Sequence, residues 1–271
     1  MKSYRNLKEV RRKETLGRRF SLTGLGVLFL GMLASFVPNW YPPGSTPPND
    51  FAAFLQQYWA LASFIALPIG FICASIGSYF INRFARRRWP GSNTIARPDE
   101  VIERNMKGFD DKFAFFAHSL PGSTYVIAGP CGVLILAVRN DRGKIVINGN
   151  RWREPFSFGK ILTIFAREGI GHPPQEVEEQ RKKLHALLQK VPSEGLPENQ
   201  AVANVPIDGA AVFLNEQAQL QIENPVIPVL RADQIKEFVR RKTKEAKVTA
   251  ATAQALTDYL RSQATFKADT D

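Results

Sequence analysis

Residues 124–139 read TYVIAGPCGVLILAVR and place three side chains where a pair of strands could do chemistry. Two runs rich in β-branched and aliphatic residues flank a turn signal at residues 129–132, so the segment predicts a buried β-hairpin. Counting outward in antiparallel register sets Thr124 opposite Ala137, and the two-residue period of a strand puts Arg139 on the same face. We therefore expect a hydroxyl, a methyl group and a guanidinium to share one small area of the sheet.

The chemistry open to this trio is hydrogen bonding rather than metal or acid–base catalysis. A methyl group cannot ligate a metal, and a neutral hydroxyl is a poor substitute for the carboxylates that hold hard divalent cations. The guanidinium of Arg139 stays protonated, so it cannot act as a base. Gln180 lies on the apolar stripe of a predicted helix, three residues after Val177 and four before Leu184, so its amide needs a partner inside the protein. A structural bridge and a part of a site both fit that glutamine.

The elements before the hairpin begin with two long apolar runs. Residues 20–38 and residues 51–82 contain no charged residue. A helix of about 20 apolar residues crosses a bilayer core, so both runs predict transmembrane helices. Recurrent glycine and alanine in both runs favour an antiparallel helical hairpin, because small residues let helices approach closely in lipid. A cleaved signal peptide is the alternative for the first run, but the residues that follow it lack a small-x-small cleavage site.

The charge distribution predicts how this hairpin lies in the membrane. Twelve basic and three acidic residues precede Pro90, so this part carries +9 of the formal net charge of +11, and the remainder carries +2. Basic clusters lie before the first run and after the second, which places both termini in the cytoplasm. Because the basic residues flank apolar runs, the charge indicates a membrane protein more than a nucleic-acid-binding one. The bilayer is the partner that the sequence itself indicates.

The chain divides into five segments. We expect a basic cytoplasmic arm at residues 1–19, amphipathic or disordered, a two-helix transmembrane hairpin at 20–82, a basic juxtamembrane linker at 83–97, an α/β domain at 98–245, and a C-terminal surface helix and tail at 246–271. Within the α/β domain, Asp99 and Glu100 begin a helix that the pattern extends, with a break at Gly108, as far as Leu120.

The strands and helices after that helix follow from local patterns. A third strand at residues 144–148 is predicted to continue the hairpin through a turn at residues 140–143, which makes a three-stranded meander. The remaining expected elements are a short helix at residues 156–166, a helix at 175–190, strands at 202–214 and 220–222, and a helix after Asp233. Two cysteines, Cys73 and Cys131, do not make a disulfide framework. His118, His172 and His185 are too scattered to suggest a metal site.

The order of these pieces resembles a known family. An acidic helix start, a meander with Gly-Pro-x-Gly at its first turn, a tryptophan after the third strand, and a later helix with an inward glutamine are similar to the nuclease-related domain called NERD. NERD is a branch of the PD-(D/E)xK restriction-endonuclease-like superfamily. The resemblance covers roughly residues 98–241 and is strongest at 124–188. It implies a restriction-endonuclease-like α/β domain with a mixed central sheet.

The chain departs from the family pattern at the catalytic positions. The family's first strand opens with Asp-His, where this chain has Thr124-Tyr125, and its second strand ends in Glu-x-Lys, where this chain has Ala137-Val138-Arg139. The resemblance implies that the two acids would hold a divalent cation such as magnesium and that the lysine would orient or activate water. The family's helix acid corresponds to Asp110 or Asp111, and Gln180 matches the family's retained glutamine.

Three functional hypotheses follow, and the first is the one we favour. A membrane-anchored, catalytically degenerate domain would bind a protein partner, a copy of itself or, with weak support, nucleic acid, and would need no cofactor. Alternatively, an active nuclease would hold Mg²⁺ through relocated acids, with Asp111, Asp141 or Glu154 as replacements. A third possibility is an accessory subunit of a membrane complex, such as a transporter or secretion complex.

Overall fold

The computed structural model describes residues 1–42, 44–89, 95–155, 169–191 and 202–265. This part of the chain forms two compact units. One is a helical hairpin made of residues 12–84, and the other is an α/β unit made of residues 1–11 and of the described residues from 85 onward.

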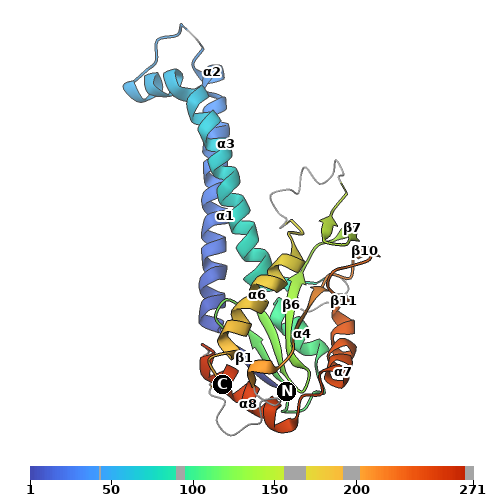
Figure 1. Cartoon of the computed structure of the whole chain (residues 1–271). Coiled ribbons are helices and arrows are strands. Elements are labelled where there is room, and N and C mark those ends of the chain that lie inside the picture. Colours follow the sequence, from blue (N-terminus) through green and yellow to red (C-terminus); the bar gives the residue numbers. More distant parts are fainter. Residues whose placement is uncertain (43, 90–94, 156–168, 192–201, 266–271) are drawn as a thin grey trace. The chain divides into compact units, whose positions relative to one another are not determined.

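The helical unit contains two long helices, α1 (Leu7–Ser35) and α3 (Asp50–Phe84), with the short helix α2 (Val37–Trp40) between them (Figure 1). Both long helices are long and apolar enough to cross a membrane, which confirms the two predicted apolar helices. Helix α1 begins well before its apolar part, because the Lys, Arg and Glu residues that precede Phe20 are good helix formers.

Glycines set the close approach of α1 and α3. A Cβ added to Gly24 would lie 2.6 Å from the backbone nitrogen of Ala74, and one added to Gly31 would lie 2.6 Å from the Cβ of Ala66. Gly31 also accepts, through its carbonyl oxygen, a hydrogen bond of 3.1 Å from Ser63 Oγ. Any larger side chain at these glycines would separate the two helices.

The α/β unit is built on a six-stranded mixed sheet. Its order is β1-β4-β5-β6-β9-β11. Strand β5 is antiparallel to its neighbours β4 and β6, and the other neighbouring pairs are parallel. The strands are β1 (Lys2–Arg5), β4 (Ala114–Ala117), β5 (Tyr125–Gly129), β6 (Gly132–Arg139), β9 (Ile207–Phe213) and β11 (Val229–Arg231).

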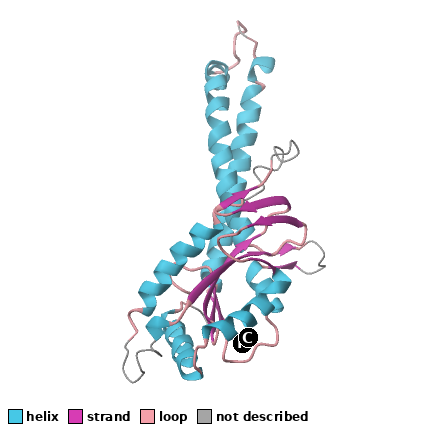
Figure 2. Ribbon diagram, turned by 45° about the vertical axis from the view of Figure 1, so that its right-hand side comes forward, coloured by secondary structure: helices cyan, strands magenta, loops and turns pink. Residues whose placement is uncertain are grey.

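Helices cover both faces of this sheet (Figure 2). Helices α6 (Pro173–Leu188) and α8 (Ala250–Gln263) pack on one face through Val177, Leu184, Leu256 and their neighbours. Helices α4 (Pro98–Asn105) and α7 (Ile235–Ala246) pack on the other face. The alternation of β5 and β6 residues between the two cores follows from the two-residue period of a strand.

Two smaller sheets complete the unit. Strands β10 (Ala218–Glu223), β7 (Gly143–Asn148) and β8 (Arg151–Arg153) form a three-stranded sheet in that order. Strands β2 (Arg87–Arg88) and β3 (Ile95–Ala96) form an antiparallel pair.

Three local predictions are wrong. Residues 114–117 form β4 and not the end of a helix, because all four side chains are buried between two cores and a continuous apolar run suits a central strand. Strand β7 exists, but its partners are β8 and β10, so the predicted meander with β6 is wrong. The N-terminal arm is neither disordered nor wholly helical, since β1 pairs in parallel with β4.

The remaining elements agree with the predictions, with shifted ends. The acidic helix start is α4, the helix with the inward glutamine is α6, and the helix after Asp233 is α7. The strand expected at residues 202–214 begins only at Ile207, after a short 3-10 helix, and residues 220–222 fall in β10. Helix α8 is less superficial than expected, because Ala253, Leu256 and Leu260 are buried. The helix expected at residues 156–166 lies outside the described residues.

Candidate functional site

The hairpin of β5 and β6 has the register that the sequence predicts. Ala128 faces Val133 and Gly129 faces Gly132 across the turn, and the pairing extends to Val126 opposite Ile135. Gly132 has a φ of +78° and approaches the carbonyl oxygen of Pro206 so closely that an added Cβ would lie 2.5 Å from it. The turn therefore requires glycine there, and the same count continued outward sets Thr124 opposite Ala137.

Helix α6 lies over this face of the sheet and brings Gln180 to Thr124. Gln180 is 4% exposed, and its Oε1 accepts a hydrogen bond of 3.0 Å from the Thr124 backbone nitrogen. Its Nε2 lies 3.3 Å from Thr124 Oγ1 and 3.4 Å from Glu176 Oε1. The inward glutamine is thus a bridge between α6 and the start of β5, with its amide satisfied on both sides.

Arg139 ends the same row at β6 and is held by three acceptors. Its Nε donates to the Ile170 carbonyl oxygen at 2.9 Å, and its Nη1 donates to the Val138 carbonyl oxygen at 2.9 Å. Its Nη2 donates to Glu176 Oε2 at 2.6 Å. The Arg139 side chain is 7% exposed and that of Glu176 is 21% exposed, so the ion pair is largely shielded from water.

Thr124, Gln180, Glu176 and Arg139 therefore form one continuous hydrogen-bonded cluster, with the Ala137 methyl group buried in the same core. We call these four hydrogen-bonded residues the strand–helix cluster. Glu176 is the member that sequence reasoning missed, since its place in the first turn of a helix already had an explanation in the helix dipole. The available signal was its spacing, because a residue four positions before an inward Gln180 lies on the same helix face.

The strand–helix cluster bridges α6 to β5 and β6, and its side chains do not make a good ligand set for a hard divalent cation. Such a cation takes about six oxygen ligands, usually with several carboxylates. The cluster offers the single carboxylate of Glu176, which already accepts from Arg139 and Gln180. Within the described ranges no group of three or more His, Cys, Asp and Glu side chains is placed to hold a metal ion.

The other acidic candidates lie elsewhere. Asp111 is 81% exposed and 3.4 Å from the Met1 amino nitrogen. Asp111 comes just before the start of β4, and that start lies beside the hairpin turn because Ala114 pairs with Ala128. Thr124 lies at the opposite end of β5, so roughly 20 Å of strand separates the two residues. Asp110 is also exposed, 4.0 Å from Lys112 Nζ. Asp141 follows β6 and Glu154 follows β8, and neither takes part in the hydrogen bonds of the strand–helix cluster.

The histidines do not converge. His118 Nε2 lies 3.0 Å from the hydroxyl of Tyr125, whereas His172 and His185 are exposed on and before α6. The three histidines therefore lie in separate environments.

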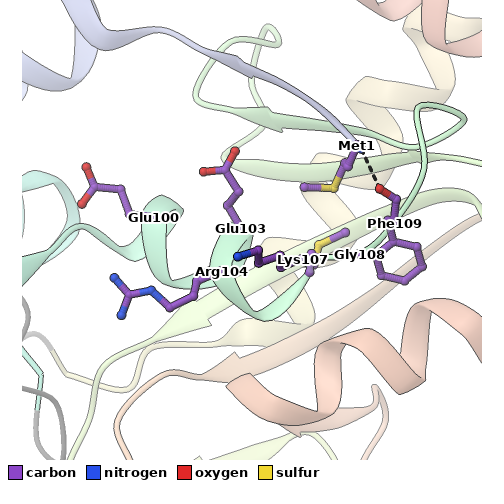
Figure 3. Close-up of a pocket in the computed structure, with 8 residues that line it drawn as sticks. Met1, Glu100, Glu103, Arg104, Lys107, Gly108 and Phe109 are labelled. Carbon is purple, nitrogen blue, oxygen red and sulfur yellow. Dashed lines mark hydrogen bonds between the residues drawn. The ribbon is translucent and has the colours of Figure 1, made fainter.

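A cavity of about 560 Å³ lies beside α4, on the other face of the sheet. Its lining consists of Met1, Glu100, Glu103, Arg104, Met106, Lys107, Gly108 and Phe109. Figure 3 shows the Met1 amino nitrogen donating a hydrogen bond of 2.7 Å to the carbonyl oxygen of Phe109. The cavity shares no residue with the strand–helix cluster.

Ion pairs already occupy the carboxylates around this cavity. Glu103 accepts from Ser3 and Arg5, and Glu100 accepts from Arg86 at 2.7 Å. Burial acts to raise the pKa of Glu100, but hydrogen bonds from the Arg97 backbone and from Arg86 outweigh it and lower that pKa. These pairs fasten β1 and the segment after α3 to α4, which is a structural role.

The comparisons with known proteins leave the chain without an assigned family. No family model, no curated protein and no solved structure matches it.

Proposed function

We propose that this chain is a membrane-anchored module whose α/β unit binds or assembles with a partner and does not cleave nucleic acid. The observation that carries the proposal is the strand–helix cluster. It keeps the hairpin and the inward Gln180 of a nuclease-like site, but Thr124 and Ala137 stand where the acids would be. A buried Arg139–Glu176 ion pair at 2.6 Å occupies the remaining position.

The element order supports a restriction-endonuclease-like scaffold of the NERD type. Helix α4, the β5–β6 hairpin, helix α6 and strand β9 follow one another in the chain, and β9 pairs in parallel with β6. Strand β4 is inserted between α4 and the hairpin, where the sequence predicts only helix. The scaffold assignment is part of the proposal and supplies the reason to compare these positions with catalytic ones.

The anchor is the hairpin of α1 and α3. Basic residues flank the two apolar helices on one side, and the loop between the helices has none, which supports a cell-membrane protein with two spans. By the same rule both termini and the α/β unit face the cytoplasm. A partner would then be met at the cytoplasmic surface, either as a second protein, another copy of the chain, or a subunit of a membrane complex.

One observation favours an active nuclease instead. Glu176 is an acid that reaches the strand–helix cluster from α6. If Arg139 released it, the carboxylate would offer ligand oxygens close to Thr124. This alternative still needs a second acid, and Asp110 and Asp111 lie at the other end of the strands.

A cleavage assay separates the two functions. The purified full chain in detergent is incubated with labelled DNA and RNA while Mg²⁺ or Mn²⁺ is titrated, beside the Glu176→Gln and Asp111→Ala variants. The binding module predicts no metal-dependent cleavage by any of the three proteins. Cleavage that depends on metal and disappears in Glu176→Gln, but persists in Asp111→Ala, would overturn the proposal.

A second experiment looks for the partner directly. Crosslinking in intact membranes, followed by mass spectrometry, should recover a protein crosslinked to the α/β unit or a dimer of the chain. Nucleic acid is the weaker option, because the chain after Pro90 has a formal charge of only +2. Binding to nucleic acid predicts an affinity that falls steeply with added salt.

A further inference from the structure

The three-stranded sheet has one buried and one exposed face. Ile145, Ile147 and Trp152 point into the core beside α6. The alternate residues of the same strands are exposed, and we call their surface the basic sheet face. Its polar residues are Lys144, Asn148, Arg151, Arg153, Gln219, Gln221 and Glu223. Arg153 pairs with Val146 and Arg151 pairs with Asn148 in the antiparallel register of β7 and β8. The cations therefore share one side of the sheet.

Positive charge dominates this face. Lys144, Arg151 and Arg153 are joined by Arg142 in the turn before β7, and all four side chains are exposed. None of the four has a hydrogen bond or ion pair to another residue of the described ranges. Arginines left without partners on an open sheet face are available for an anionic ligand.

The acids near the face are already occupied. Glu223 ends β10, and its two carboxylate oxygens accept from Asn148 Nδ2 at 3.0 Å and from Gln221 Nε2 at 3.2 Å. Asp141 and Glu154 flank the basic residues in the chain, and both are half-buried and hold partners of their own. The carboxylate of Glu223 is thus hydrogen-bonded to neighbouring amides and does not pair with the cations of the face.

We propose that the basic sheet face docks on an anionic phospholipid surface. Its cations are spread over one side of a three-stranded sheet, with Arg151 and Arg153 about 7 Å apart along β8, a spacing that lets each meet a separate headgroup phosphate. The face presents amides and one valine between the cations and no exposed aromatic ring. Single-stranded nucleic acid is usually held by stacking on such rings, so the face lacks the second half of that kind of site.

The tether also favours lipid, and here the inference rests on the membrane anchorage proposed above. Only Asn6 separates β1 from α1, and residues 85–97 link α3 to α4. Even the longer of these two links, residues 85–97, reaches at most about 45 Å when extended. The bilayer surface is therefore presented to the α/β unit at a high effective concentration. Each basic residue near an anionic leaflet contributes about fivefold to binding, which makes weak individual contacts sufficient.

The test uses the full chain in nanodiscs. A fluorophore is attached at Gln219→Cys in a Cys73→Ser background, while Cys131 stays in place because it is buried. Lipids with a quencher on the headgroup report the approach of the label as phosphatidylserine replaces phosphatidylcholine. We expect quenching that grows with phosphatidylserine, and Arg151→Glu/Arg153→Glu should lower the docking equilibrium constant at least about 25-fold.

A matched control removes the effect of overall charge. Arg240→Glu/Lys244→Glu on the exposed side of α7 changes the net charge equally and should leave the quenching at position 219 unchanged. Equal quenching without phosphatidylserine, or equal loss in both double variants, would overturn the proposal. Displacement of the label from lipid by a single-stranded oligonucleotide that needs Arg151 and Arg153 would assign the face to nucleic acid instead. A chain that fails to co-purify with nanodiscs would refute the anchorage, which is a separate outcome.

Discussion

Glu176→Ala is the perturbation that examines the strand–helix cluster most directly. The substitution removes the carboxylate that accepts from Arg139 Nη2 at 2.6 Å and from Gln180 Nε2 at 3.4 Å. Arg139 then keeps two backbone acceptors but loses its counter-charge. Because the Arg139 side chain is only 7% exposed, water cannot fully replace the lost partner.

The expected cost follows from this geometry. Removing one partner of a fully buried pair costs about 3–5 kcal/mol, mainly because the other charge is stranded. Glu176 is 21% exposed and Arg139 keeps the carbonyl oxygens of Ile170 and Val138, so we expect about 2–3 kcal/mol. Arg139→Met should cost less, about 1 kcal/mol, since Glu176 can turn to solvent and the methionine packs in the apolar surroundings.

Hydrogen exchange with mass spectrometry measures this cost where it arises. Amides of β5, β6 and α6 should exchange faster in Glu176→Ala, and the change in protection gives the free energy of opening for each segment. The double variant Arg139→Met/Glu176→Ala should be closer to the wild type than the sum of the single changes predicts. That difference is the coupling energy of the pair.

The control lies two residues after Glu176 on the same helix, on a different and more exposed face. Glu178 pairs with Arg181 at 3.3 Å, with side chains that are 45% and 46% exposed, so Glu178→Ala should change the opening free energy by less than about 1 kcal/mol. If Glu176→Ala costs no more than Glu178→Ala, or if the double variant is simply additive, the ion pair does not hold the cluster together and the reasoning fails.

Three further predictions concern other parts of the chain. Gly24→Val should lower the free energy of unfolding of the full chain in detergent by about 1–3 kcal/mol, because an added Cβ would lie 2.6 Å from the Ala74 backbone nitrogen. Gly26→Val is the control and should leave this free energy unchanged, because an added Cβ there meets no atom within 4 Å. The pKa of Glu100 is lowered from 4.5 by the hydrogen bonds that its carboxylate accepts. The stabilisation that these bonds give the folded state is present above pH 4.5 and is lost as the pH falls through the folded-state pKa. Glu100→Gln should therefore reduce the loss of unfolding free energy at acid pH, measured in a pH titration of stability. Burial raises the pKa of Cys131 to about 12, so alkylation detected by mass spectrometry should be slow until the protein unfolds, and rapid labelling of native protein would contradict its burial.

The hairpin and the inward glutamine were predictable because both depend on local periodicity. A glycine-rich turn and a period of two are enough to set the register of β5 and β6, and spacings of three and four are enough to bury Gln180. The identity of its partner was also within reach, since Thr124 opens the neighbouring strand. Glu176 shows the limit, because an acid in a first helix turn has a sufficient local explanation and its pairing with Arg139 depends on the tertiary fold.

The errors share a different cause. Strand β4 is buried on both sides, so it has no alternation of polar and apolar residues to distinguish it from a buried helix segment. Strand β1 contains Lys2 and Arg5 and has no apolar pattern; it is a strand because β4 offers it an open edge. Strand β7 follows a good hairpin turn, yet its parallel partner β10 is about 75 residues away in the chain and no local signal indicates it.

Under the nuclease-like scaffold proposed above, charge balance explains how the strand–helix cluster is stable without a metal site. Paired carboxylates in a core are stable only when a cation neutralises them, so losing them singly would leave a buried charge. Here the hydroxyl of Thr124 and the methyl of Ala137 are neutral, and the guanidinium of Arg139 pairs with the carboxylate of Glu176. The charges of the four cluster residues therefore cancel without a metal, and Gln180 bridges Thr124 and Glu176. Introducing a single acid, as in Ala137→Glu, should therefore destabilise the fold and not create a metal site, because the new carboxylate would be buried and would compete with Glu176 for Arg139.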